Sequence, residues 1–156
     1  MTSHRLVRLP VAAAAVLLAV SGCSSGGSAA SVAVPSPPAG EAAFCRALHE
    51  ELPRTVAGLD RKDPEPESEL TAGWGDAAIV LRCGVPRPEK LNDVRAPGAT
   101  VGGVDWMIEK PEGGGTKVTS TYRMTYVEVI LDERFTDVAP LVELAPAVKK
   151  AVPPSL

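Results

Sequence analysis

The sequence predicts an α+β fold, a two-layer domain in which an antiparallel sheet of about four strands packs against an N-terminal and a C-terminal helix. Apolar and polar residues alternate in several short segments between residues 78 and 131, as in strands with one buried face. Apolar residues recur at helical spacing before and after these segments. Antiparallel strands commonly expose one face, so both helices are expected on the other.

The first helix is predicted over residues 41–52, where one apolar stripe is formed by Phe44, Leu48 and Leu52. We expect it to end at Pro53, because a proline deep in a helix removes a backbone hydrogen bond and clashes, at about 3 kcal/mol. A short turn is expected over residues 53–59, and a charged, solvated loop over residues 60–68.

Four strands are expected after a turn at residues 73–76, namely residues 78–83, 104–109, 117–122 and 125–131. In the second of these, Trp106 shares the apolar face and is expected in the core. The glycines at 113–115 suit a hairpin loop between the second and third strands. A phosphate-binding loop is the alternative, but neither a Lys-Ser or Lys-Thr pair nor a helical pattern follows.

The last helix is expected to begin at Thr136 or Asp137, either of which can cap it. Its apolar stripe is formed by Val138, Leu141, Leu144 and Val148, and Pro146 is expected to interrupt it.

The N-terminus has the features of a secretory signal. Arg5 and Arg8 precede an unbroken apolar run over residues 11–20. This run is about ten residues, whereas a membrane-spanning helix needs roughly 20, so a retained transmembrane helix is the weaker interpretation. We therefore predict a cleaved signal peptide over residues 1–22.

The residues Leu18-Ala19-Val20-Ser21-Gly22-Cys23 resemble the bacterial lipobox. The resemblance implies that Cys23 receives a diacylglyceryl lipid and becomes the new N-terminus. Buried acyl methylenes each contribute roughly 0.8 kcal/mol, so two or more chains hold a protein firmly on a membrane. The alternative is cleavage by an ordinary signal peptidase, which would leave a free thiol at Cys23.

The domain organisation follows from a change of composition. Residues 23–40 form the lipidated N-terminus and an uncharged tether rich in Ser, Gly, Ala and Pro, which we expect to be flexible. Residues 41–156 form a single α+β domain. Lipidation places this domain on the extracytoplasmic face of the cell membrane.

The charge balance limits the class of partner. The chain has 16 Lys and Arg against 19 Asp and Glu, a formal net charge of −3. This balance argues against nucleic acid as a partner. The partners that we expect are the membrane, which the protein contacts through the lipid on Cys23, and an envelope protein or wall polymer.

The two remaining cysteines have competing interpretations. Cys45 is on the first helix and Cys83 on the core face of the first strand, so a disulfide would join the two layers, as is usual outside the cytoplasm. The alternative is a zinc site in which His49, one helical turn after Cys45, is a third ligand. A redox-active pair is a weaker interpretation, because no Cys-x-x-Cys is present.

The sequence has few residues that suggest catalysis, and neither a cofactor motif nor a nucleophile motif is present. An alternative is a catalytic pair of carboxylates of the glycosidase type, drawn from residues on strands or strand ends, namely Asp105, Glu109, Glu128 and Asp132. The solvated face of a sheet is the simpler interpretation of these acids. A candidate interaction patch is formed by Trp74, Asp76, Arg82 and Arg87, with Trp74 as a partly exposed anchor.

Six short stretches carry a resemblance to a known family, at residues 44–48, 52–53, 74–76, 80–86, 104–106 and 126–129. The most specific is Leu-Arg-Cys-Gly-Val-Pro at residues 81–86. The chain is similar over about residues 44–148 to an actinobacterial family of secreted proteins and lipoproteins classed as domain of unknown function 3515. The resemblance implies an envelope location and a cysteine pair at Cys45 and Cys83. It implies no reaction, cofactor or catalytic residue.

Together these patterns favour a membrane-anchored, non-enzymatic binding or accessory module of the cell envelope. A wall-modifying hydrolase that uses strand-end carboxylates is the alternative.

Overall fold

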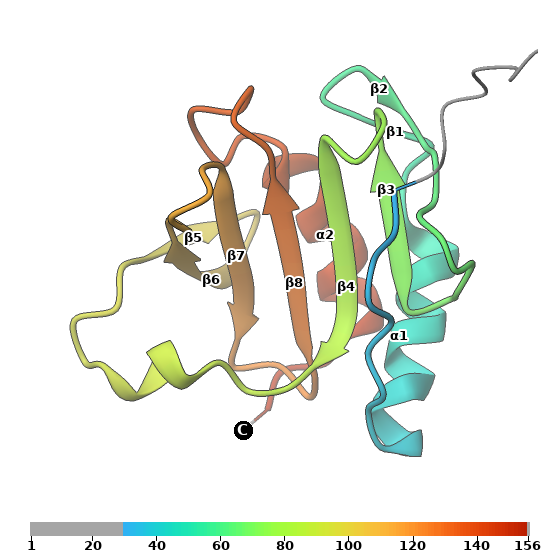
Figure 1. Cartoon of the computed structure of the whole chain (residues 1–156). Helices are drawn as coiled ribbons and strands as arrows, with labels where there is room; N and C mark the ends of the chain where they lie inside the picture. Colours follow the sequence, from blue (N-terminus) through green and yellow to red (C-terminus); the bar gives the residue numbers. More distant parts are fainter. Residues whose placement is uncertain (1–29, 156) are drawn as a thin grey trace, which may run out of the picture.

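One face of a six-stranded antiparallel sheet carries both helices in the computed structural model, which describes residues 30–155 (Figure 1). The strands lie in the order β3 (Thr71–Trp74), β4 (Ile79–Val85), β8 (Tyr126–Leu131), β7 (Thr116–Thr121), β6 (Val104–Glu109) and β5 (Gly98–Val101). A separate two-stranded hairpin consists of β1 (Thr55–Val56) and β2 (Leu59–Asp60). We call the helix-covered face of the large sheet the inner face, and the opposite face the outer face.

The α+β class and the antiparallel sheet are as predicted, but about four strands was too few. The expected turn at 73–76 lies partly in β3, whose four residues are all buried and therefore show no alternation. The β5 strand begins at Gly98 and contains no fully buried residue, and because Ala99 and Val101 on its inner face are only half-buried, its apolar pattern is weak. The expected turn and loop over residues 53–68 contain β1 and β2, joined at Ala57 and Gly58, whose φ values of 51° and 74° suit a tight hairpin.

The two helices agree with the pattern at their centres and differ at their ends. Helix α1 (Ala39–Glu51) buries Cys45 and Leu48 and ends before Leu52 and Pro53. Helix α2 (Leu141–Ala151) begins later than expected, because Asp137 caps a preceding turn by accepting a 2.9 Å hydrogen bond from the backbone N–H of Ala139.

Pro146 lies inside α2 without interrupting it, contrary to the expectation. Pro146 is exposed, and its neighbours Leu144, Ala145 and Val148 are buried in the core. Apolar burial on both sides of the proline keeps the helix in place despite the missing backbone hydrogen bond.

The hydrophobic core lies between the inner face and the helices, and a disulfide crosses it. Cys45 on α1 and Cys83 on β4 are joined, with their Cα atoms 5.5 Å apart, as the sequence predicts. Trp106 is 2% exposed and belongs to this core, also as predicted. The bond holds α1 against β4, the strand next to the β3 edge of the sheet.

Part of the expected tether is packed on the domain. The backbone N–H of Val32 donates to the carbonyl of Glu65 (2.9 Å), and Arg82 Nε donates to the carbonyl of Ala33 (3.0 Å). Pro37 lies against Gly84, which has a φ of 83° and where a side chain would overlap the proline ring. Figure 1 shows this segment, in blue, running along β4 and β3 before it enters α1. The carbonyl of Ala30 also accepts a hydrogen bond from the N–H of Glu65 (2.9 Å), so the expectation of a flexible tether up to residue 40 is wrong from residue 30 onward.

The predicted signal peptide and Cys23 lie outside the described residues. Within residues 30–155, neither helix combines the length and the hydropathy that crossing a membrane requires.

Candidate binding groove

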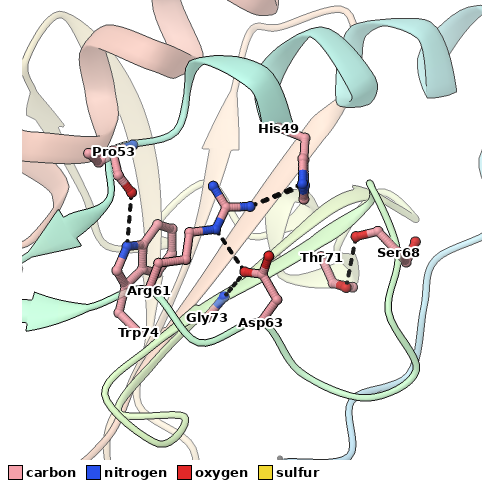
Figure 2. Close-up of polar contacts among 8 residues, drawn as sticks. All are labelled: His49, Pro53, Arg61, Asp63, Ser68, Thr71, Gly73 and Trp74. Atoms are coloured by element: carbon pink, nitrogen blue, oxygen red, sulfur yellow. Dashed lines mark hydrogen bonds and ion pairs between the residues drawn. The ribbon is translucent and has the colours of Figure 1, made fainter.

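The predicted interaction patch includes Trp74, but this residue is completely buried. Its indole N–H donates to the backbone carbonyl of Pro53 (3.1 Å), and the Arg61 guanidinium carbon lies 5.7 Å from the ring centroid (Figure 2). Trp74 therefore joins the end of α1 to β3 from inside, and it cannot serve as an exposed anchor.

The other three patch residues each have a local partner. Asp76 binds Lys62, whose hydrogen bond and positive charge lower the pKa of the Asp76 carboxyl. Arg82 pairs on the outer face with Glu128 of β8 (2.9 Å), and Arg87 donates to the side chain of Asn92 (2.7 Å). The structure does not bring the four residues together, and the patch prediction is wrong.

The alternative metal site also lacks its ligands. The disulfide uses both thiols that the Cys45, His49 and Cys83 set would need. One amino nitrogen of Arg61 lies 3.3 and 3.2 Å from the two ring nitrogens of His49, and Arg61 Nε donates to Asp63 (2.8 Å), as Figure 2 shows. A fixed guanidinium next to the imidazole repels a cation. Asp63 also accepts from the backbone N–H of Gly73 (3.2 Å), so this cluster ties the loop after β2 to β3 and α1.

Three of the four strand carboxylates considered for hydrolysis are engaged in ion pairs. Glu128 binds Arg82, Glu109 lies 3.0 Å from the ammonium of Lys117, and Asp132 lies 2.9 Å from the guanidinium of Arg134. A pair of carboxylates that shares a substrate needs a different environment for each acid. The fourth, Asp105, accepts a hydrogen bond from the hydroxyl of Thr100 (2.5 Å) and has no ion pair among residues 30–155.

A groove of about 640 Å³ lies at the β5 end of the sheet, and we call it the edge groove. Its walls are the loop from Leu91 to Pro97, the adjoining parts of β5 and β6, and the end of β7 with Tyr122. The loop begins within a 3₁₀ helix, η1 (Glu89–Asn92). Sequence reasoning did not find this groove, since its walls come from four segments that each look like ordinary loop or edge strand.

Two large apolar side chains of the edge groove are directed into solvent. Val94 is 99% exposed and Tyr122 is 73% exposed. The sequence predicts a strand that includes Tyr122, but β7 ends at Thr121 and Tyr122 has a φ of 56°. The signal that could have identified Val94 is its position as an isolated apolar residue between Asp93 and Arg95 in a loop.

Contacts with the C-terminal residues hold Tyr122 in its uncommon conformation. The backbone N–H of Ser155 donates to the carbonyl of Tyr122 (3.0 Å), and that of Met124 donates to the carbonyl of Pro153 (2.9 Å). Between them, Arg123 Nη1 donates to the carbonyl of Val152 (2.9 Å). Positive φ at a bulky residue costs free energy, and such strained residues are concentrated at functional sites. Tyr122 is therefore a candidate binding residue.

The charge of the edge groove is negative. Asp93 and Asp105 line it, and no basic side chain among the described residues does. The backbone N–H of Arg95 donates to Asp93 (2.9 Å) and lowers the pKa of its carboxyl, with a smaller contribution from Lys90. Lys90 and Arg95 partly neutralise Asp93 from outside the groove, at 3.4 and 3.8 Å. Asp105 is the carboxylate best placed to attract a positively charged group.

Replacing Tyr122 with glycine tests whether its side chain supports the fold. We expect the free energy of unfolding to rise by up to about 1 kcal/mol, because positive φ costs an L-residue about 1–2 kcal/mol and the freer unfolded chain of glycine offsets part of the gain. Urea unfolding measures the change, and Tyr122→Phe, which keeps the strain, is the matched control. A loss of stability in the glycine variant would mean that the Tyr122 side chain holds the turn.

A family model described as a protein of unknown function, DUF3515, matches residues 7–155. Neither the curated proteins nor the solved structures contain a match to the chain.

Proposed function

Because this chain belongs to DUF3515, a family of proteins of unknown function, we propose its role from its own sequence and surface. It is a lipoprotein, held on the extracytoplasmic face of the cell membrane by a lipid on Cys23, and it binds another component of the cell envelope through the edge groove. The observation that carries the binding role is the pair of exposed apolar side chains, Val94 and Tyr122, at a groove of about 640 Å³.

The proposed anchor is supported by sequence and by cysteine chemistry. The lipobox-like residues 18–23 follow an apolar run of signal-peptide length. Cys45 and Cys83 form a disulfide, which is the usual state of paired cysteines in an oxidising compartment. This pairing leaves Cys23 as the odd cysteine of three, consistent with a modified residue.

The path of the chain separates the groove from the point at which the tether joins the domain. Residues 30–37, the last part of the expected tether, pack on the domain. These residues join the domain near β3 and β4, whereas the groove is at the β5 edge of the same six-stranded sheet. Five strand spacings separate the two edges, or about 24 Å. The groove is therefore distant from the attachment point and accessible to a partner.

An exposed aromatic beside an apolar residue is the usual composition of an interaction anchor. Tyrosine supplies a large contact area with few rotatable bonds, so ordering it costs little entropy. The groove of this chain combines that anchor with the carboxylates of Asp93 and Asp105, which give polar selectivity.

The anchor is tested by membrane fractionation of the full chain. We expect Cys23→Ala to move the exported protein from the membrane pellet to the soluble fraction, because no acyl chain can then be attached. Ser24→Ala, at the adjacent position, is the control and remains in the pellet. A Cys23→Ala protein that still sediments with membranes would exclude lipid anchoring at this residue.

The binding role is tested with a photo-crosslinking amino acid placed in the native membrane. At position 94 the side chain is 99% exposed and a crosslinked species is expected. Val142, 60% exposed on α2, is the matched control away from the groove, and no such species is expected there. Equal labelling from both positions would refute binding through the edge groove.

A further inference from the structure

The β5 strand has one edge without a backbone partner. The N–H of Ile108 donates to the carbonyl of Pro97 (2.8 Å), and β5 pairs with β6 in a register that places Gly98 opposite Met107 and Thr100 opposite Asp105. In an antiparallel ladder the hydrogen-bonded pairs alternate with the others, so the N–H and C=O groups of Gly98 and Thr100 point away from β6. Within residues 30–155, no backbone or side-chain group bonds to these outward amides and carbonyls.

The opposite edge of the sheet is protected. The N–H of Lys62 donates to the carbonyl of Gly73 in β3 (2.9 Å), and Arg61 forms an antiparallel bridge with Trp74. Proteins usually cover an edge strand or place a charged side chain on it, because an open edge is a template for another strand. The β5 strand Gly98–Val101 carries neither a charge nor a proline.

The open edge adjoins the edge groove. Gly98 and Thr100 line the groove and share the outer face of the sheet with Asp105. Residues added opposite Gly98 and Thr100 would direct their side chains to the same face. Such side chains would extend toward Val94 and Tyr122.

We propose that β5 accepts an extended peptide segment of the envelope partner as a seventh strand, with a basic side chain directed toward Asp105. This inference rests on the proposed binding role of the edge groove. Strand addition satisfies the outward amides and carbonyls, and alternate side chains supply specificity. A lysine or arginine complements the acidic groove, whereas a second copy of this chain would bring two more carboxylates to it.

The probe is the peptide acetyl-Ser-Val-Lys-Ile-Lys-Val-Ser-amide, titrated against the full chain by calorimetry. We expect it to bind, and a version with both lysines replaced by glutamate to bind roughly tenfold more weakly or not at all, since like charges oppose association. A third version, N-methylated at both lysines, loses the amides that would face β5 and is expected to bind at least about tenfold more weakly. Equal binding of the N-methylated peptide would overturn strand addition.

Three protein variants locate the contact. Thr100→Pro removes the outward amide while edge strands tolerate proline, so binding should be lost. Thr100→Val also loses the hydroxyl contact with Asp105 but keeps the amide, and should bind within about twofold of the parent. Asp105→Asn should reduce the preference for the lysine peptide over the glutamate peptide by about tenfold and leave unfolding in urea unchanged. An unaltered preference in this variant would overturn the role of Asp105.

The failure of this inference is distinguishable from that of the proposed function. Crosslinking from position 94 without binding of the lysine peptide would overturn strand addition and leave the groove as a binding site. If neither the crosslinked species nor binding of the lysine peptide is observed, both strand addition and the proposed binding role of the edge groove are overturned. Sedimentation provides a further test, because a dimer that Thr100→Pro converts to a monomer would assign the edge to a second copy and overturn the peptide proposal.

Discussion

Replacing Cys45 and Cys83 together with alanine lowers the free energy of unfolding by about 4 kcal/mol. The bond joins residues 38 apart, and closing a loop of that length removes this much chain entropy from the unfolded state. Small domains have total stabilities of about 5–15 kcal/mol, so the loss is a large share. Both cysteines are buried, and their removal also loosens the contact between α1 and β4.

Urea unfolding of the parent and the double variant, both in the absence of reductant, measures this difference. The control is Cys23→Ala, which leaves the disulfide intact and should unfold at the same urea concentration as the parent. Reduction of the parent should reproduce most of the loss. A change below about 1 kcal/mol would contradict the assignment of the disulfide as a main support of the fold.

Replacing Trp74 with alanine destabilises the domain by roughly 3–5 kcal/mol, the usual cost of emptying a large buried aromatic site. The indole is fully buried, and its N–H is bonded to Pro53 at the end of α1. Its loss also removes the ring beneath the Arg61 guanidinium. The expected change is thus in stability, since Trp74 presents no surface to a partner.

Thermal or urea unfolding measures this effect, and crosslinking from position 94 separates it from binding. Under conditions in which the Trp74→Ala protein remains folded, crosslinking should equal that of the parent. Val142→Ala, at an exposed position of α2, is the control and should change stability by less than about 0.5 kcal/mol. A stable Trp74→Ala protein that no longer crosslinks would restore Trp74 as a binding residue.

The sequence predicts most of the fold because the elements with strong local patterns are also those that pack in the core. The strands expected at 78–83, 104–109, 117–122 and 125–131 correspond to β4, β6, β7 and β8, and in each of them the alternating apolar residues belong to the core. The missed strands lack a clear pattern, because β3 is buried on both faces and the inner face of β5 is only half-buried. Pro146 was misjudged for a related reason, since core packing of its neighbours outweighs the local helix-breaking effect.

The candidate site was much less predictable than the fold. Trp74 is flanked by glycines, which suggests an exposed turn, but the end of α1 and Arg61 enclose it. Tyr122 continues an alternating pattern, but the C-terminal residues pair with its turn and hold it outside the strand. In both cases the deciding contact comes from a segment distant in the chain.

The sequence by itself determined the α+β class, four of the strands and both helices, because periodicity acts between near neighbours. It also favoured a disulfide between Cys45 and Cys83, since paired cysteines outside the cytoplasm are usually oxidised. Only the tertiary structure decided that residues 31–37 pack on the sheet, that Trp74 is buried and that Val94 and Tyr122 border an acidic groove beside an open strand edge. These features depend on contacts between residues far apart in sequence, such as Tyr122 with Ser155 and Trp74 with Pro53. No local pattern encodes such contacts, since their free energy arises only when the whole chain has folded.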